Sequence, residues 1–278
     1  MTRLRTWVAP LVLGMLGGSA MVGLLAASPG RVEAEDEARC ADLPGHAALS
    51  AAIKAAVDGG GNSGLANDVW MALVSRDGIV CQVTFSGVHR GAQWSAGRAF
   101  AVEKASTAVA FSLPRGSGGI DGLALSTANL YAASQPGGML FGLESTERAE
   151  AAFAGRAVTH GLPEDPLVGK RTSGRATVGG GLALYDAAGT LVGALGISGD
   201  TPCTDHILAW KVRYALNLDN VPAGMSATGD DNIIHDMEPD VTTGSVVSRR
   251  GFGHPVCDAT ATRIAEALPS THPVGPSP

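Results

Sequence analysis

The sequence predicts an α+β fold in which helices cover an antiparallel sheet. Two pairs of β-prone runs are each joined by a short turn, and helical patterns precede, separate and follow these pairs. Strands joined by short turns pair antiparallel, and amphipathic helices bury their apolar stripes against another layer. We therefore predict one α+β domain at residues 35–220, followed at residues 221–278 by a loop-rich C-terminal extension with a Pro-rich tail.

The domain begins with a helix and a hairpin. A helix is predicted over residues 47–57, where apolar residues recur at helical spacing and the run Asp58-Gly-Gly-Gly ends the pattern. Two β-prone runs follow at 69–74 and 79–85, and an Asp-Gly pair between them supplies the positive φ of a tight turn. These two runs predict the first antiparallel hairpin.

A long helix is predicted over residues 93–111. The segment is rich in Ala and free of Pro, and small residues on one face allow a helix to lie close against a sheet. The Pro- and Gly-punctuated stretch that follows contains two shorter helical patterns, at 123–132 and 145–159. We expect short helices at both places.

A second hairpin and a last helix complete the predicted domain. The β-prone runs 182–185 and 190–197 flank a four-residue loop that ends in Gly189. A helix is predicted over 204–217, with Asp205 near its start, where the helix dipole favours a carboxylate.

The N-terminus has the pattern of a secretion signal. Arg3 and Arg5 precede an uncharged apolar stretch at 7–27, and a small-residue motif ending at Ala34 follows. We predict a signal peptide at residues 1–34 with cleavage after Ala34; the alternative is an uncleaved membrane anchor, since about 20 apolar residues can span a bilayer as a helix. Either reading places the rest of the chain outside the cytoplasm, in the periplasm or secreted.

Composition and cysteine content agree with an exported protein. The net charge is −6 and no block of Lys or Arg occurs, which disfavours nucleic acid as a partner. The four cysteines predict two disulfides, for which three pairings are open. None lies in a C-x-x-C pair, which argues against a dithiol redox site or a thiolate zinc site. The disulfide candidates are Cys40, Cys81, Cys203 and Cys257.

Two segments resemble the GlcG/HbpS-type haem-binding family. The first is the Gly-rich hairpin, with Gly179-Gly180-Gly181-Leu182-Ala183-Leu184 and the run from Val192 to Gly199; the second is Lys104-Ala105-Ser106-Thr107-Ala108 within the long helix. The likeness spans residues 45–220, and Ala183 departs from the Pro that is usual in the family. The resemblance implies an antiparallel sheet of about five strands, haem or a related tetrapyrrole as ligand, and a homo-oligomer.

A haem site needs apolar walls, an axial donor for iron and cationic or polar groups for the two propionates. We rank His206 first as donor, because it lies near the start of the last helix beside Asp205, and His254 second, because Gly253 and Pro255 flank it on a stiff turn. For each, the ordinary alternative is a surface or capping histidine. The full set of histidines is His46, His89, His160, His206, His235, His254 and His272.

The resemblance implies a second set of ligand residues on the long helix. An oxygen at Thr107 or a neighbour is expected to contact iron or its bound water, and Lys104, one turn earlier, to meet a propionate. Two ordinary roles compete with these: a threonine hydroxyl inside a helix often bonds back to an upstream carbonyl, and a lysine is usually solvated.

The sequence contains no nucleophile elbow and no H-E-x-x-H motif, so we do not expect an enzyme of those classes. The leading interpretation is a non-catalytic, exported haem-binding protein for capture, storage or sensing. Two alternatives stay open: a haem-degrading or oxidative enzyme that uses the bound iron, and a partner-binding module without a cofactor.

Overall fold

The computed structural model describes residues 40–117, 119, 121–143, 157–171, 175–242 and 244–275. The predicted signal peptide at 1–34 and most of the predicted helix at 145–159 fall outside these residues. Within the described ranges, no helix is both long and apolar enough to cross a membrane.

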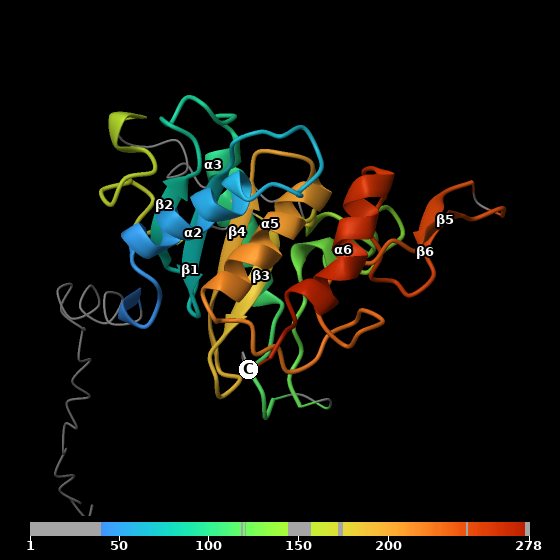
Figure 1. The fold of residues 1–278 in the computed structure, drawn as a ribbon. Coiled ribbons are helices and arrows are strands. Elements are labelled where there is room, and N and C mark those ends of the chain that lie inside the picture. Colours follow the sequence, from blue (N-terminus) through green and yellow to red (C-terminus); the bar gives the residue numbers. More distant parts are fainter. Residues whose placement is uncertain are drawn as a thin grey trace, which may run out of the picture.

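The predicted antiparallel sheet is present, and both predicted hairpins are confirmed (Figure 1). The strand order is β2-β1-β4-β3, so that the two hairpins meet where β1 pairs antiparallel with β4. The four strands are β1 (Trp70–Ser75), β2 (Val80–Phe85), β3 (Gly181–Tyr185) and β4 (Leu191–Ser198).

In the described part of the chain this sheet has four strands, where the resemblance implies about five. Short irregular segments occupy both of its edges. The Val80 amide donates to the Lys170 carbonyl (2.9 Å), and the Tyr185 amide on the opposite edge donates to the Leu218 carbonyl (2.8 Å). Each contact forms only an isolated bridge rather than a further strand.

Helices cover both faces of the sheet. One face packs against α3, and the other packs against α2 and α5, with α6 lying beside α5 (Figure 1). The side chains of β1 alternate accordingly: Met71 and Leu73 join the core under α2 and α5, whereas Ala72 and Val74 join the core under α3. The helices are α2 (His46–Asp58), α3 (Gly97–Ala110), α5 (Pro202–Ala215) and α6 (Ala259–Thr271).

The helix α3 lies unusually close to the sheet because the residues between them are small. Almost all of its side chains are buried, including the charged Lys104. A Cβ atom at Gly196 of β4 would overlap the Ala101 carbonyl of α3. The glycines of the second hairpin therefore allow a helix backbone to rest on a strand backbone.

The stretch predicted as a short helix at 123–132 forms one only from residue 127 onward. Ser126 caps a 3-10 turn, η1 (Thr127–Leu130), by accepting from the Asn129 amide, and α4 (Tyr131–Ser134) continues it. Residues before Ser126 instead bond to neighbouring loops. For example, the Leu123 amide donates to the Leu113 carbonyl, and the Leu113 amide donates to the Leu123 carbonyl. A further turn, η4 (Ala157–Thr159), is described at the end of the 145–159 segment.

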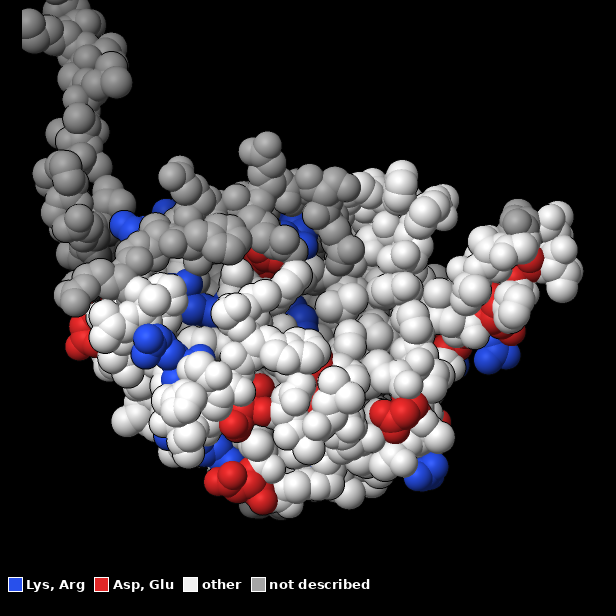
Figure 2. Space-filling view, turned by 90° about the horizontal axis from the view of Figure 1, so that it is seen from above, with Lys and Arg blue, Asp and Glu red and all other residues white. Residues whose placement is uncertain are grey.

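Beyond residue 222 the chain is mostly loop, as predicted, but the prediction missed the 13-residue helix α6. Asp258 caps α6 by accepting from the Thr260 and Ala261 amides, and Ala261, Ala265 and Leu268 enter the core beside α5. A small hairpin of β5 (Met237–Pro239) and β6 (Val246–Ser248) projects from the body (Figures 1 and 2).

Charged side chains on the surface are interspersed rather than gathered. On the face in Figure 2, Lys and Arg alternate with Asp and Glu among uncharged residues. The most tightly held ions are inside: Arg213 with Asp231, Lys104 with Asp205, and Arg98 with Asp165 are all buried pairs. The Arg213–Asp231 pair attaches the loop after residue 222 to α5.

Candidate functional site

Thr107 is fully buried, and its hydroxyl has two protein partners. It donates to the Glu103 carbonyl one turn earlier (2.7 Å) and accepts from the Ala176 amide (3.1 Å). This is the back-bonded arrangement that competes with a ligand role for a helical threonine. Thr107 thus joins α3 to the segment that leads into β3.

Lys104 is not solvated. Its ammonium donates to Asp205 of α5 (2.8 Å) and to the Ile197 carbonyl of β4 (2.9 Å). The lysine also lines a shallow cavity of about 210 Å³, whose exposed aromatic wall is Trp94. Burial raises the pKa of Asp205 to about 6, although Lys104 opposes that shift.

His206 lies inside the core that α5 shares with the sheet. Its Nε2 is 3.2 Å from Asn232 Oδ1 and 3.1 Å from the Ile233 amide nitrogen, and its ring faces Trp210. Burial lowers the pKa of His206 to about 3, so the imidazole is neutral at physiological pH. His206 lines none of the four cavities that contain Ile234, Ala66, Ala52 and Trp94, respectively.

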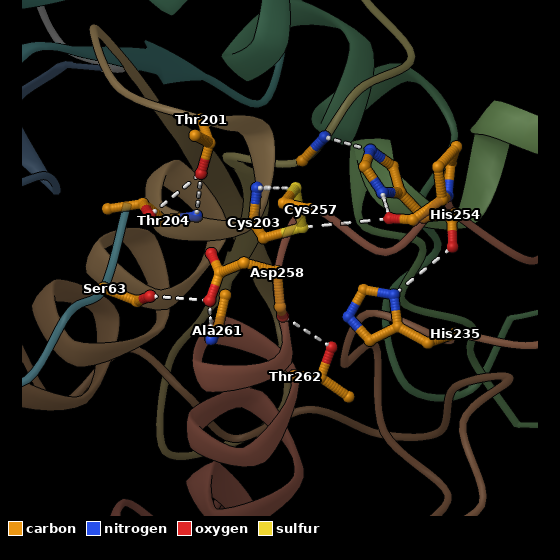
Figure 3. Close-up of a disulfide and its surroundings, with 12 residues drawn as sticks. Ser63, Thr201, Cys203, Thr204, His235, His254, Cys257, Asp258, Ala261 and Thr262 are labelled. Atoms are coloured by element: carbon orange, nitrogen blue, oxygen red, sulfur yellow. Dashed lines mark hydrogen bonds between the residues drawn. A yellow bond between two sulfur atoms is a disulfide. The ribbon is translucent and has the colours of Figure 1, made fainter. Parts of the chain in front are cut away.

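His254 is also buried, and both ring nitrogens have partners. Nδ1 lies 2.8 Å from the Pro255 carbonyl oxygen, and Nε2 accepts from the Gly179 amide at 3.4 Å (Figure 3). The ring packs against Tyr131 at a centroid distance of 5.1 Å. Burial lowers the pKa of His254 to about 4.

Three of these four residues surround the glycine triplet at the start of β3. A Cβ at Gly179 would press on His206, one at Gly180 would press on the Lys104 ammonium, and the Gly179 amide bonds to His254. The glycine motif and the lysine motif are therefore linked by packing: the backbone threads between α3 and α5 where only hydrogen atoms fit.

A cavity of about 480 Å³ lies between the loop 226–236 and α6. His235 lines it. The imidazole Nδ1 bonds to the His254 carbonyl at 3.3 Å (Figure 3), whereas its buried Nε2 has no hydrogen-bond partner among the described residues. An imidazole nitrogen without a partner, buried beside a cavity, becomes a metal donor once a small movement of its neighbours opens it to that cavity.

The charges around this cavity are mixed. Arg249 and Arg250 line it and are exposed, and the carboxylate of Glu266 reaches it from α6. Burial lowers the pKa of His235, while the backbone carbonyl of His254 and the charge of Glu266 oppose this shift. The imidazole of His235 is therefore neutral at pH 7, which is the form that binds a metal.

The sequence names His235 among seven histidines but gives no reason to rank it first. Its cavity exists because the loop 226–236 packs against α6, and the sequence prediction treats that region as loop. The Asp258 cap and the i, i+4, i+7 spacing of Ala261, Ala265 and Leu268 are the signals that could have revealed α6.

The buried histidines predict a dependence of stability on acid. The folded-state pKa of His254, about 4, lies below the value of about 6.5 of a free histidine, so the unfolded chain binds more protons below pH 6.5 and stability falls as the pH falls toward 4. The free energy of unfolding of the wild type should therefore fall when the pH is lowered from 7.5 to 5. In His254→Gln, which lacks this titrating group, the fall should be about 2 kcal/mol smaller.

Urea denaturation at the two pH values measures this difference. The raised pKa of Asp205 has the opposite effect on stability, since it stabilises the folded protein at lower pH. Asp205 is present in both proteins, so its contribution cancels in the comparison. The exposed His89→Gln is the matched control and should follow the wild type. Parallel pH profiles for His254→Gln and the wild type would contradict the assignment.

Comparison with known proteins gives matches among solved structures only. No protein-family model matches the sequence, and no curated protein matches it. The crystal structure of a PduOC:haem complex is 25% identical, covers 63% of this chain and 96% of its own, and has a TM-score of 0.41. The Klebsiella pneumoniae protein ORFY, a DUF336 protein, is 20% identical, covers 61% and 88%, and has a TM-score of 0.38. Both agree with the resemblance stated from the sequence, but with TM-scores below 0.5 neither carries an argument about the ligand.

Proposed function

We propose that this chain is an exported protein that binds haem or a related tetrapyrrole in the cavity lined by His235, for capture, storage or sensing. The observation that carries the proposal is the buried Nε2 of His235, which has no partner in the described part of the chain. Thr107, Lys104 and His254 are less suitable, because their polar atoms bond to the protein. His206 also has a buried nitrogen without a partner, Nδ1, but its side chain is fully buried in the packed core and lines none of the four cavities described.

The residues around the cavity meet the three requirements of a haem site. Ile233, Ile234 and Pro269 supply apolar surface, and His235 supplies an axial nitrogen. Arg249 and Arg250 supply two cations for the two propionates. The volume of about 480 Å³ falls within the range of about 300–1,000 Å³ that is usual for small-molecule sites.

Neighbouring residues fix the orientation and the tautomer of the His235 imidazole. A Nδ1–H that donates to the His254 carbonyl fixes the tautomer and leaves the lone pair on Nε2. His254 is itself held by the Gly179 amide and by Tyr131. Bound haem would supply an iron centre with redox chemistry, while the protein residues orient it and restrict water.

Delivery outside the cytoplasm is part of the proposal. The charged and apolar pattern of residues 1–34 supports it, as do the disulfides Cys40–Cys81 and Cys203–Cys257, since disulfides persist in oxidising compartments.

An absorption titration of the full chain with ferric haem tests the function. We expect a saturable spectral shift at one haem per chain. The double variant Arg249→Ala/Arg250→Ala should weaken binding about five- to tenfold, because it removes two exposed charge contacts to the propionates. Arg263→Ala, on the same helix as Glu266 but outside the cavity, is the control and should bind like the wild type. The absence of a saturable shift in the wild type would overturn the proposal and favour a partner-binding module.

A further inference from the structure

We infer that Cys203, Cys257 and His254 form a separate, redox-gated metal site, which takes a thiophilic cation such as Zn²⁺ once the Cys203–Cys257 disulfide is reduced. The site lies at the start of α5, where the C-terminal segment crosses it (Figure 3). It does not depend on haem binding.

The fold brings these ligands together although they are far apart in sequence. One donor atom from each of the three residues lies within 4.8 Å of the other two, and no other group of His, Cys, Asp or Glu in the described ranges does so. Ligand atoms around a tetrahedral zinc ion are about 3.3–3.8 Å apart, as Zn–S bonds of about 2.3 Å and Zn–N bonds of about 2.0 Å require. Side-chain shifts of about an ångström would close the site.

The absence of a C-x-x-C pair argues against a thiolate metal site when the sequence is read alone. In the structure, Cys203 and Cys257 are 54 residues apart and still bonded to each other. His254 precedes Cys257 by three residues in the segment that leads into α6. The three ligands therefore come together only in the folded protein, and their spacing in the sequence does not indicate a metal site.

Local electrostatics favour thiolates at this place. Cys203 lies in the first turn of α5, a 14-residue helix, where the dipole stabilises negative charge. Its backbone amide already donates to the Cys257 sulfur at 3.2 Å. His254 complements the sulfurs with an imidazole nitrogen. One of its two hydrogen bonds, to the Pro255 carbonyl or from the Gly179 amide, is exchanged for the bond to the metal.

Reduction and metal uptake balance as two steps. The thiolate of a dithiol reductant attacks the half-buried Cys257 sulfur rather than the buried Cys203, the S–S bond breaks, and Cys203 leaves as a thiolate at the helix N-terminus. The second thiol of the reductant then resolves the mixed disulfide, so the reductant becomes a disulfide and the protein gains two electrons. Zn²⁺ binds the two sulfurs and displaces their remaining protons to solvent.

The second disulfide supplies a matched control. Cys40 and Cys81 are joined in the same way but have no third ligand nearby among the described residues. The double variant Cys40→Ser/Cys81→Ser therefore leaves one disulfide, the one at the proposed site. The converse variant, Cys203→Ser/Cys257→Ser, removes the proposed ligands.

The experiment is a Co²⁺ titration, followed by Zn²⁺ displacement, of the Cys40→Ser/Cys81→Ser chain before and after reduction with a phosphine. We expect no thiolate–cobalt absorption in the oxidised protein and one tightly bound ion in the reduced protein. Adding His254→Ala should weaken zinc binding at least about tenfold. The Cys203→Ser/Cys257→Ser chain should show no thiolate–cobalt absorption under either condition.

Near-UV circular dichroism separates a native site from metal bound to an unfolded chain. The metal-loaded reduced protein should have the native spectrum and a higher thermal midpoint than the metal-free reduced protein. Binding that leaves the chain unfolded, binding unaffected by His254→Ala, or no thiolate–cobalt complex after reduction would each overturn the inference.

Discussion

Replacing Asp231 by alanine is expected to lower the free energy of unfolding by about 4 kcal/mol. Its carboxylate accepts two hydrogen bonds of 2.7 Å from Arg213, and both side chains are fully buried. The guanidinium also donates to the Ala183 carbonyl and lies over Trp210. Without Asp231, the buried Arg213 loses the carboxylate that hydrogen-bonds to it and keeps only the longer-range attraction of Asp219 and Asp230, which is the costly outcome for a buried pair.

Urea denaturation of Asp231→Ala against the wild type measures this loss. The matched control is Glu238→Ala, which breaks the exposed Glu238–Arg249 contact at 3.6 Å and should cost less than about 1 kcal/mol. The double variant Arg213→Met/Asp231→Leu should recover most of the stability, because it leaves no buried charge. Equal losses for Asp231→Ala and Glu238→Ala would show that the buried pair has no special role.

Gly196→Ala is expected to cost about 3 kcal/mol or more, at the upper end of the usual range for overpacked cores. The added methyl group would overlap the Ala101 carbonyl, and the Ala105 amide nitrogen would lie 2.7 Å from it. These are backbone atoms of α3, so no side-chain rotation relieves the contact. The helix must move away from β4, and the core between them loses its close packing.

The thermal midpoint and the urea midpoint both report this change. Gly45→Ala is the control, since no described atom lies within 4 Å of a Cβ there and the residue precedes α2. It should cost no more than about 1 kcal/mol, because Gly45 is the N-cap of α2, where alanine is less favourable than glycine but nothing is overpacked. A Gly196→Ala protein as stable as Gly45→Ala would contradict the packing account of the glycine-rich hairpin.

The regular part of the fold could be predicted because its signals are local. Each hairpin has β-prone runs on either side of a short Gly-containing turn, and the strands 182–185 and 190–197 end within one residue of β3 and β4. The long helix is shorter than predicted, beginning at Gly97 rather than at residue 93, because the residues before it form turns. The edge contacts depend on segments far apart in sequence, so local patterns did not indicate them. The helix α6 does have local signals, a capping Asp258 and regularly spaced apolar residues, which the prediction did not use.

The site was harder to predict because burial decides which polar atoms are free. Thr107 and His206 carry the right donor types, yet the Thr107 hydroxyl bonds to the chain itself and the free Nδ1 of His206 is enclosed in the packed core. His235 differs from them only in what surrounds it after folding: a cavity on one side and the His254 carbonyl on the other. The type of a residue and its spacing in the sequence indicate neither the cavity nor the contact with the His254 carbonyl.

The most direct test of the haem proposal is the affinity of His235→Ala for ferric haem, measured by absorption titration beside the wild type. Loss of the axial nitrogen should weaken haem binding at least about tenfold and change the Soret band. Iron-free protoporphyrin needs no axial ligand and should bind both proteins equally. His206→Ala, if folded, should retain the wild-type haem spectrum. A His235→Ala protein with unchanged haem affinity and spectrum would contradict the assignment of His235 as the axial ligand and show that another residue has this role.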